Sequence, residues 1–320
     1  MSSSMATVRS GGGDYSQRLR ADSPRYGEKA IKLVLMLAAA VSVVVTTSIV
    51  ISLLGPSISF FQTEEVTLRE FFTGTTWAPS LATPSFGVMP IVVGTLMVVF
   101  FSLIVAIPLG LLSAIYLSEY ASKKVRKIVK PILEVLEGIP TVATGLFAFF
   151  WLKPAIESVT PFLPWSGPFS IGVAGIAVGF LIIPLVSSVS DDAMRSVPRS
   201  LREGAYALGA SKFEVSIKVV LPAAVSGIIA AIVLGASRAV GETMVVLLVS
   251  GAGNPNLSFD PTKGIQTMTA FIGNRATGDI ATGTLDYNTI FAVGALLFFM
   301  TLAMNIVAIR LVKRFREVYE

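Results

Sequence analysis

Neither cysteine nor histidine occurs in this chain of 320 residues. Their absence excludes disulfides, thiol chemistry, zinc sites built from Cys and His, and catalytic schemes that use an imidazole. Charged residues are scarce as well: they make up 14% of the chain, against about 25% in soluble domains. With 53% hydrophobic residues and a mean hydropathy of +0.75, the composition is that of a protein that lies in a lipid bilayer.

The hydrophobic residues gather in runs without Asp, Glu, Lys or Arg, at 33–63, 71–118, 158–190, 219–237 and 287–309. A helix needs about 20 apolar residues to cross the hydrocarbon core. The runs and their flanks predict an all-α bundle of six transmembrane helices, at 31–54, 89–116, 132–152, 171–189, 223–250 and 288–310. The third is the least regular, because Glu134 and Glu137 lie in its first turns, but its aromatic end at 147–152 is typical of a membrane interface.

Lysine and arginine are distributed unequally between the loops. Segments 1–32, 117–131, 190–222 and 310–320 carry six, five, five and four of them. The alternating segments 55–88, 153–170 and 251–287 carry one, one and two. By the positive-inside rule the first set is cytoplasmic, so both termini are predicted to lie inside the cell. The net charge of +5 then reflects topology, and no nucleic-acid partner is expected.

The segments around the helices complete the predicted organisation. Residues 1–30, rich in Ser, Gly and Arg, are expected to form a disordered cytoplasmic tail. The apolar run at 31–54 is longer than the roughly 7–15 residues of a signal peptide, so the first transmembrane helix is predicted to be retained. An extracytoplasmic loop at 55–88 leads to a core of five transmembrane helices at 89–310, and residues 311–320 form a second cytoplasmic tail.

The cytoplasmic loop 200–222, between the fourth and fifth predicted helices, is unusual for a connector. From Arg202 it reads REGAYALGASKFEVSIKVVLP, which predicts a short helix, a left-handed turn at Gly209, and a second short helix stopped by Pro222. Small and apolar residues give the first helix one partly apolar face. The pattern alone fits an amphipathic segment on the membrane surface as well as it fits a contact with a partner.

The spacing within this loop resembles the EAA loop of binding-protein-dependent ABC importer permeases. The matching positions are Glu203, Ala205, Gly209, Leu221 and Pro222. Two positions depart from the family: Gly204 replaces the usual alanine, and Val219 replaces the usual isoleucine. The resemblance implies a MetI-like multi-pass permease of a bacterial plasma membrane. It also implies that the loop is a coupling helix, with Glu203, Ala205 and Gly209 docking on a cytoplasmic ATPase.

The chain has no ATP-binding motif of its own, because G-x-x-x-x-G-K-[ST] does not occur in it. It is therefore not expected to be an enzyme by itself or to hold a cofactor. ATP and Mg²⁺ would be bound by the separate ATPase that the resemblance implies, and the chain would be one part of an ATP-hydrolysing complex.

Two charges, Arg238 and Glu242, lie inside the fifth predicted helix. A charge at the centre of a membrane costs about 2.5–3.5 kcal/mol on insertion scales, so such residues mark a function or a specific partner. Their i, i+4 spacing predicts that they share one helix face and partly neutralise each other. The pair is either a structural ion pair or part of an anion pathway, since the planar guanidinium suits oxyanions.

The segment RAVGETM at 238–244 is similar to the Arg-Ala-x-Gly-Glu-Thr segment of phosphate importer permeases. Its methionine, with GNP at 253–255, QTMTAF at 266–271 and ILEVLEGIPT at 132–141, resembles the PstC type of subunit. The resemblance covers about 89–310 and implies an ATP-driven importer of inorganic phosphate. Its other parts would be a PstA-type permease, two copies of a PstB-type ATPase, and a PstS-type phosphate-binding protein that meets loops 55–88 and 251–287.

Glu134 and Glu137 lie near the cytoplasmic end of the third predicted helix, at i, i+3. They are expected either to pair with Lys127 and Lys130, or to line the inner mouth of a substrate pathway that also contains Arg238 and Glu242. The sequence leaves both interpretations open.

Two other functions fit parts of the sequence. A permease for sulfate, molybdate or an amino acid would keep the coupling loop and lose only the Arg-Ala-x-Gly-Glu-Thr resemblance. An ion-coupled secondary transporter or an intramembrane enzyme fits less well. The coupling loop and the lack of inverted sequence halves disfavour the transporter, and the lack of Cys, His and metal motifs disfavours the enzyme.

Overall fold

The computed structural model describes residues 26–81, 83–251 and 254–316. Residues 1–25 of the predicted N-terminal tail and 317–320 of the predicted C-terminal tail lie outside them. The predicted all-α class is confirmed. In the described part of the chain the strands are β1 (Trp77–Ala78) and β2 (Ser85–Phe86), an antiparallel pair in which Trp77 lies opposite Phe86.

The first long helix is α2 (Tyr26–Phe61). Apolar residues occupy all of its faces, as in a helix surrounded by lipid. It runs beyond the predicted end at residue 54, because no charge occurs before Glu64 and because its last turns place Phe60 in a buried aromatic cluster. Residues up to 52 form one unit and residues from 53 form a second, and the remaining elements belong to the second unit.

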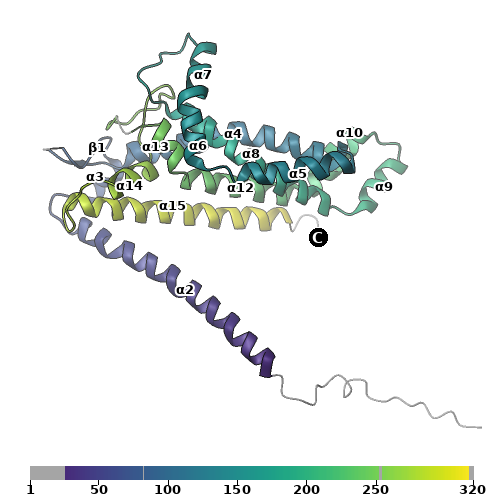
Figure 1. The fold of residues 1–320 in the computed structure, drawn as a ribbon, viewed down its shortest axis with the longest axis horizontal. Helices are drawn as coiled ribbons and strands as arrows, with labels where there is room; N and C mark the ends of the chain where they lie inside the picture. The colour runs from purple at the N-terminus through teal and green to yellow at the C-terminus, as the bar shows by residue number, and fades with distance from the viewer. Residues whose placement is uncertain (1–25, 82, 252–253, 317–320) are drawn as a thin grey trace, which may run out of the picture. The chain divides into compact units, whose positions relative to one another are not determined.

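The second unit is a bundle around α8 (Ile171–Ser196), whose apolar stretch is largely buried. Against it pack α4 (Met89–Ile115), which continues as a π-helical turn η1 (Tyr116–Tyr120), and α12 (Val225–Gly241), and α15 (Leu285–Arg316) packs in turn against α12 (Figure 1). Two glycines bring α8 close to α4: a Cβ on Gly175 would lie 2.5 Å from the Phe101 Cβ, and one on Gly179 would lie 2.8 Å from the Ser102 carbonyl oxygen. Such close approach is the usual role of G-x-x-x-G in membrane helices.

The third predicted helix, 132–152, is not continuous, and its boundaries were wrong. An amphipathic helix α5 (Lys123–Glu137) ends at Gly138, and the chain restarts after Pro140 as α6 (Thr141–Phe147), η2 (Ala148–Leu152) and α7 (Lys153–Val159). Proline has no N–H to donate and disfavours helical geometry in the residue before it, which explains the break. The membrane-length stretch is therefore 141–159, and Glu134 and Glu137 precede it.

The fifth predicted helix, 223–250, is also interrupted. After α12 ends at Gly241, Glu242 adopts an extended conformation and α13 (Met244–Val249) follows. At the other end, α10 (Lys212–Glu214), η3 (Val215–Val220) and α11 (Leu221–Ala223) form a helical segment that meets α12 at a bend of 70°. Among the described helices five are long and apolar enough to cross a membrane, or six if this bent pair counts as one.

One end of the bundle is closed by an aromatic cluster, formed by Phe60, Phe61, Phe71, Trp77, Phe86 and Phe271 with their rings edge to face. It joins the end of α2 to α3 (Leu68–Thr73), β1 and α14 (Met268–Ala276). Residues from the two predicted outer loops, 55–88 and 251–287, are thereby held together. Figure 1 shows β1, α3 and α14 at one end of the bundle and α9 and α10 at the other.

Candidate functional site

The loop predicted to couple to a partner folds as a helix, a turn and a second helix. Its first helix, α9 (Arg199–Ala207), follows Pro198 and ends where Gly209 takes a φ of +83°. The Gly209 N–H donates to the Tyr206 carbonyl at 2.9 Å and the Ala210 N–H to Ala205 at 3.1 Å, which closes the end of the helix. The predicted left-handed turn is confirmed. The predicted stop at Pro222 was wrong: Leu221 and Pro222 lie within α11, and the chain bends at Ala224.

Ser211 and Glu214 fix the start of the second helix as a reciprocal capping box. The Glu214 N–H donates to the Ser211 hydroxyl at 3.3 Å, and the Ser211 N–H donates to the Glu214 carboxylate at 3.0 Å. Hydrogen bonds from Ser211, and then the Lys218 ammonium, lower the pKa of Glu214 from 4.5 to about 2. The carboxylate therefore stays charged, and the cap stays formed, throughout the physiological pH range.

The surface of this loop presents exposed apolar side chains. Leu208 is 91% exposed and Phe213 is 66% exposed, and both lie beside the Gly209 turn. Glu203 and Gly204 are exposed, whereas Ala205 is half-buried. A Cβ on Gly204 would meet nothing within 4 Å, so the alanine usual in the resembled loop would also fit there. Large exposed apolar side chains on a short, well-capped helix pair are typical of a surface that a partner covers.

Arg202 ties this loop to the bundle, a role that the sequence analysis missed. Its guanidinium donates to the carbonyls of Val197 at 2.6 Å and Met194 at 2.8 Å, at the end of α8, and to the Glu119 carboxylate at 3.0 Å, in η1. Arg202 is 16% exposed and Glu119 is 7% exposed. Eighty-three positions separate the two residues, so no local pattern could have paired them. A movement of α9 therefore acts directly on α8 and α4.

A second group of ion pairs holds α5 against α8. The Arg126 guanidinium lies 2.5 Å from the fully buried Asp191 carboxylate, and Lys130 lies 2.5 Å from Asp192. Lys130 is thus not the partner of Glu134 or Glu137. Glu134 borders a basic hollow lined also by Lys123, Lys127 and Arg195, and no carboxylate in the described residues lies within ion-pair distance of these three cations. Of the two interpretations that the sequence left open for Glu134 and Glu137, the described residues do not show the pairing with Lys127 and Lys130.

Glu137 instead pairs with Arg238. The Arg238 Nη1 donates to Glu137 Oε1 at 3.0 Å, and its Nη2 reaches the Glu137 carbonyl oxygen at 3.4 Å. The two side chains are 31% and 35% exposed, so they lie at a surface of this chain rather than in its core. The ion pair joins the last residue of α5 to α12, so a separation of these two helices would break it.

Glu242 has a separate role, and its predicted pairing with Arg238 was wrong. Because α12 ends at Gly241, the two side chains do not share a continuous helix face. The Glu242 carboxylate accepts hydrogen bonds from the N–H groups of Met244 at 3.1 Å and Val245 at 3.2 Å, and so caps α13. Its carbonyl accepts the Thr269 hydroxyl at 2.8 Å. Glu242 therefore fixes the break between α12 and α13 and ties it to α14.

Comparison with known proteins gives concordant results. The sequence profile of the family described as "Binding-protein-dependent transport system inner membrane component" matches residues 106–317. The chain is 33% identical to the probable ABC transporter permease protein YqgH of Bacillus subtilis, over 84% of this chain and 86% of that protein. It is 32% identical to the phosphate transport system permease protein PstC of Xylella fastidiosa strain 9a5c, over 87% and 88%, and 34% identical to PstC of Pasteurella multocida, over 73% and 77%.

Solved structures show the same fold at lower sequence identity. A bacterial alginate ABC transporter, in complex with its periplasmic protein, matches with a TM-score of 0.60 and 16% identity, over 92% of this chain and 99% of that chain. The MetNI methionine ABC transporter in an inward-facing conformation matches with a TM-score of 0.52 and 19% identity, over 72% and 94%. These likenesses establish the arrangement of helices.

Proposed function

The chain belongs to the family of binding-protein-dependent transport system inner membrane components, and from this membership we propose that it is the PstC-type permease subunit of an ATP-driven importer of inorganic phosphate. As a member of that family with several membrane-length helices, it is an ABC importer permease and a multi-pass protein of the plasma membrane. Phosphate is the substrate because several relatives at 30–34% identity are PstC proteins of phosphate transport systems.

The observation that carries the proposal is the Arg238–Glu137 ion pair. Arg238 is a permanent positive charge in α12, which has no other charged residue, and it lies at a surface of the chain. A guanidinium presents five N–H donors in a planar fork that matches phosphate oxygens. Once the ion pair has opened, phosphate can accept the hydrogen bonds that the guanidinium otherwise donates to Glu137, and the carboxylate holds the guanidinium in place when no substrate is present.

Glu137 and Arg238 act in this account as a gate between α5 and α12. With the pair closed, the positive charge is neutralised and a phosphate ion gains little by approaching it. With α5 and α12 apart, the guanidinium is free to bind phosphate, and the Glu137 carboxylate repels the anion from the side of α5. Glu242 positions the end of α12 by capping α13, and Glu134, one turn before Glu137 in α5, borders the basic hollow.

Two PstB-type ATPases, each binding ATP and Mg²⁺, supply the movement through the loop at α9 and α10. The exposed Leu208 and Phe213, with Glu203 and the Gly209 turn, form the docking surface for one ATPase. Arg202 transmits the displacement of α9 to α8 and α4. A PstA-type permease completes the pathway opposite Arg238, and a PstS-type protein delivers phosphate at the end that carries α3 and α14.

The proposal is tested by uptake of labelled phosphate at low external concentration. Cells that lack this gene, and carry no other high-affinity phosphate importer, are compared with the same cells that express the wild-type chain. Expression is expected to restore phosphate uptake and to leave sulfate uptake unchanged. If expression restored uptake of sulfate or an amino acid but not of phosphate, the role as a permease would stand and the assignment of phosphate as the substrate would be contradicted.

A further inference from the structure

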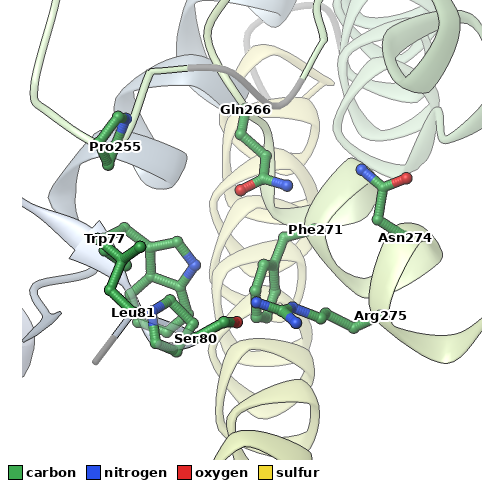
Figure 2. Close-up of a pocket in the computed structure, with 10 residues that line it drawn as sticks. Trp77, Ser80, Leu81, Pro255, Gln266, Phe271, Asn274 and Arg275 are labelled. Carbon is green, nitrogen blue, oxygen red and sulfur yellow. The ribbon is translucent and has the colours of Figure 1, made fainter. Parts of the chain in front are cut away.

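A pocket of about 390 Å³ opens at the end of the bundle opposite α9, where β1, α14 and the segment around Pro255 and Gln266 meet (Figure 2). We call it the outer pocket. Its walls are largely apolar, formed by Trp77, Ala78, Pro79, Leu81, Pro255 and Phe271, and its polar members are Ser80, Gln266, Asn274 and Arg275. Its volume is within the range of about 300–1,000 Å³ found for ligand sites. No carboxylate is among its lining residues.

Trp77 is rigidly held at the wall of this pocket. Its backbone N–H donates to the Pro255 carbonyl at 2.7 Å, and its ring meets that of Phe271 edge to face at 5.0 Å. The side chain is 3% exposed, yet its indole N–H has no acceptor among the described residues. In Figure 2 the indole nitrogen points toward the space bordered by Gln266 and Arg275. A buried indole N–H normally finds an acceptor, so this one is available to a molecule that enters the pocket.

The other polar groups of the pocket can also donate. The Arg275 guanidinium bonds Asp286 through one nitrogen at 3.2 Å and stacks on the Phe271 ring at 5.7 Å, so most of its N–H groups remain available. The Ser80 hydroxyl also faces Asp286, at 3.4 Å. The amides of Asn274 and Gln266 make no side-chain hydrogen bond within the described part of the chain, and Asn274 is exposed. The Trp77 indole and the Arg275 guanidinium can only donate, whereas the two amides can donate or accept, so the charged and buried polar groups of the pocket favour an occupant with acceptors.

We propose that the outer pocket is the docking site for a carboxylate-tipped side chain, aspartate or glutamate, on a loop of the extracytoplasmic binding protein. This inference rests on the proposed function, because a binding-protein-dependent importer must receive that partner at this end. The apolar wall favours a side chain over free phosphate, since the stem of a side chain has apolar surface to bury and a hydrated phosphate ion has none. Tryptophan and arginine in a preformed pocket are the residue types that dominate the energetics of protein interfaces.

The test uses the complete importer complex in nanodiscs and its purified, phosphate-loaded binding protein, with stimulated ATP hydrolysis as the readout. Trp77→Phe keeps an aromatic ring in the cluster and removes the indole N–H together with the smaller ring that carries it, and Asn274→Ala removes an exposed amide. Each is expected to raise the half-saturating concentration of binding protein by roughly tenfold or more, the effect of one lost hydrogen bond to a charged group, and to leave basal and maximal hydrolysis unchanged. Asp279→Ala, an exposed position beyond α14, is the matched control and is expected to change nothing.

The charge of the occupant is tested by salt. The half-saturating concentration is expected to rise with sodium chloride for the wild type and to rise less steeply for Arg275→Gln, because an arginine–carboxylate contact is screened. A wild-type half-saturating concentration that does not change with salt would overturn the assignment of a carboxylate as the occupant.

The outcomes separate this proposal from the function on which it rests. If the loaded binding protein stimulates the wild-type complex, and if Trp77→Phe and Asn274→Ala have the same half-saturating concentration as the wild type, the docking site alone would be overturned. A wild-type complex that the loaded binding protein does not stimulate would contradict the proposed function and the docking site together. Stimulation by free inorganic phosphate without the binding protein, weakened by Trp77→Phe, would make the pocket an anion site and overturn the proposal.

Discussion

Replacement of Arg202 by alanine is expected to detach the α9 loop from the bundle. The side chain makes three hydrogen bonds, to the carbonyls of Val197 and Met194 and to the Glu119 carboxylate. Its loss leaves a carboxylate that is 7% exposed without a cation. Removing one partner of a buried ion pair costs about 3–5 kcal/mol. Because Ser118 still donates to the same carboxylate at 2.9 Å, we expect the lower end of that range, about 3 kcal/mol.

Amide hydrogen exchange of residues 199–207 measures this cost directly. Since 1.36 kcal/mol is a factor of ten, a loss of about 3 kcal/mol makes opening of α9 roughly 10²-fold more frequent and its amides exchange correspondingly faster. Arg199→Ala, in the same helix but exposed, is the control and is expected to change exchange less than about threefold. Exchange in Arg202→Ala equal to that in Arg199→Ala would refute the role of Arg202 as the link between α9, α8 and η1.

Three further predictions test the loop and the bundle. Leu208→Asp, at a position 91% exposed, should lower co-purification of the ATPase about tenfold or more by placing a charge in an apolar interface, with the thermal stability of the permease unchanged. Gly179→Val should reduce the yield of folded protein, because its Cβ would lie 2.8 Å from the Ser102 carbonyl oxygen; a normal melting temperature would contradict this. The capping box should be complete above the unfolded pKa of Glu214, 4.5, and should weaken as the pH falls toward about 2; a carboxyl chemical-shift titration centred near 4.5 would disprove the cap.

The transmembrane helices follow from the sequence because their signal is local. Uncharged runs of sufficient length place α4 within one residue of its observed bounds, and they locate α2, α8 and α15, whose observed ends extend up to seven residues beyond the predicted ones. The coupling loop was also predictable as a helix, a turn and a helix, because Gly209 must take a positive φ and the residues on either side favour helix.

The interruptions of the helices and the ion pairs were harder to predict. Pro140, after Gly138, was a local signal of the break between α5 and α6 that the hydrophobicity of residues 142–152 outweighed. Glu242 gave no comparable signal, since its extended conformation depends on the cap that it makes to α13 and on Thr269 from another element. The pairing of Arg238 with Glu137 spans 101 positions, so helical periodicity suggested Glu242 instead.

The central claim is that Arg238 binds phosphate on its way through this permease. The most direct measurement is the initial rate of labelled phosphate uptake by Arg238→Gln in cells that lack the wild-type gene, at matched membrane levels of the two chains and with Arg310→Gln as the control at an exposed position of α15. Loss of two hydrogen bonds from a charged donor, each contributing about 1.5–3 kcal/mol, predicts uptake at least 10²-fold slower. Binding of the ATPase and of the binding protein should be unchanged in this variant. Uptake by Arg238→Gln at the rate of Arg310→Gln would contradict the account.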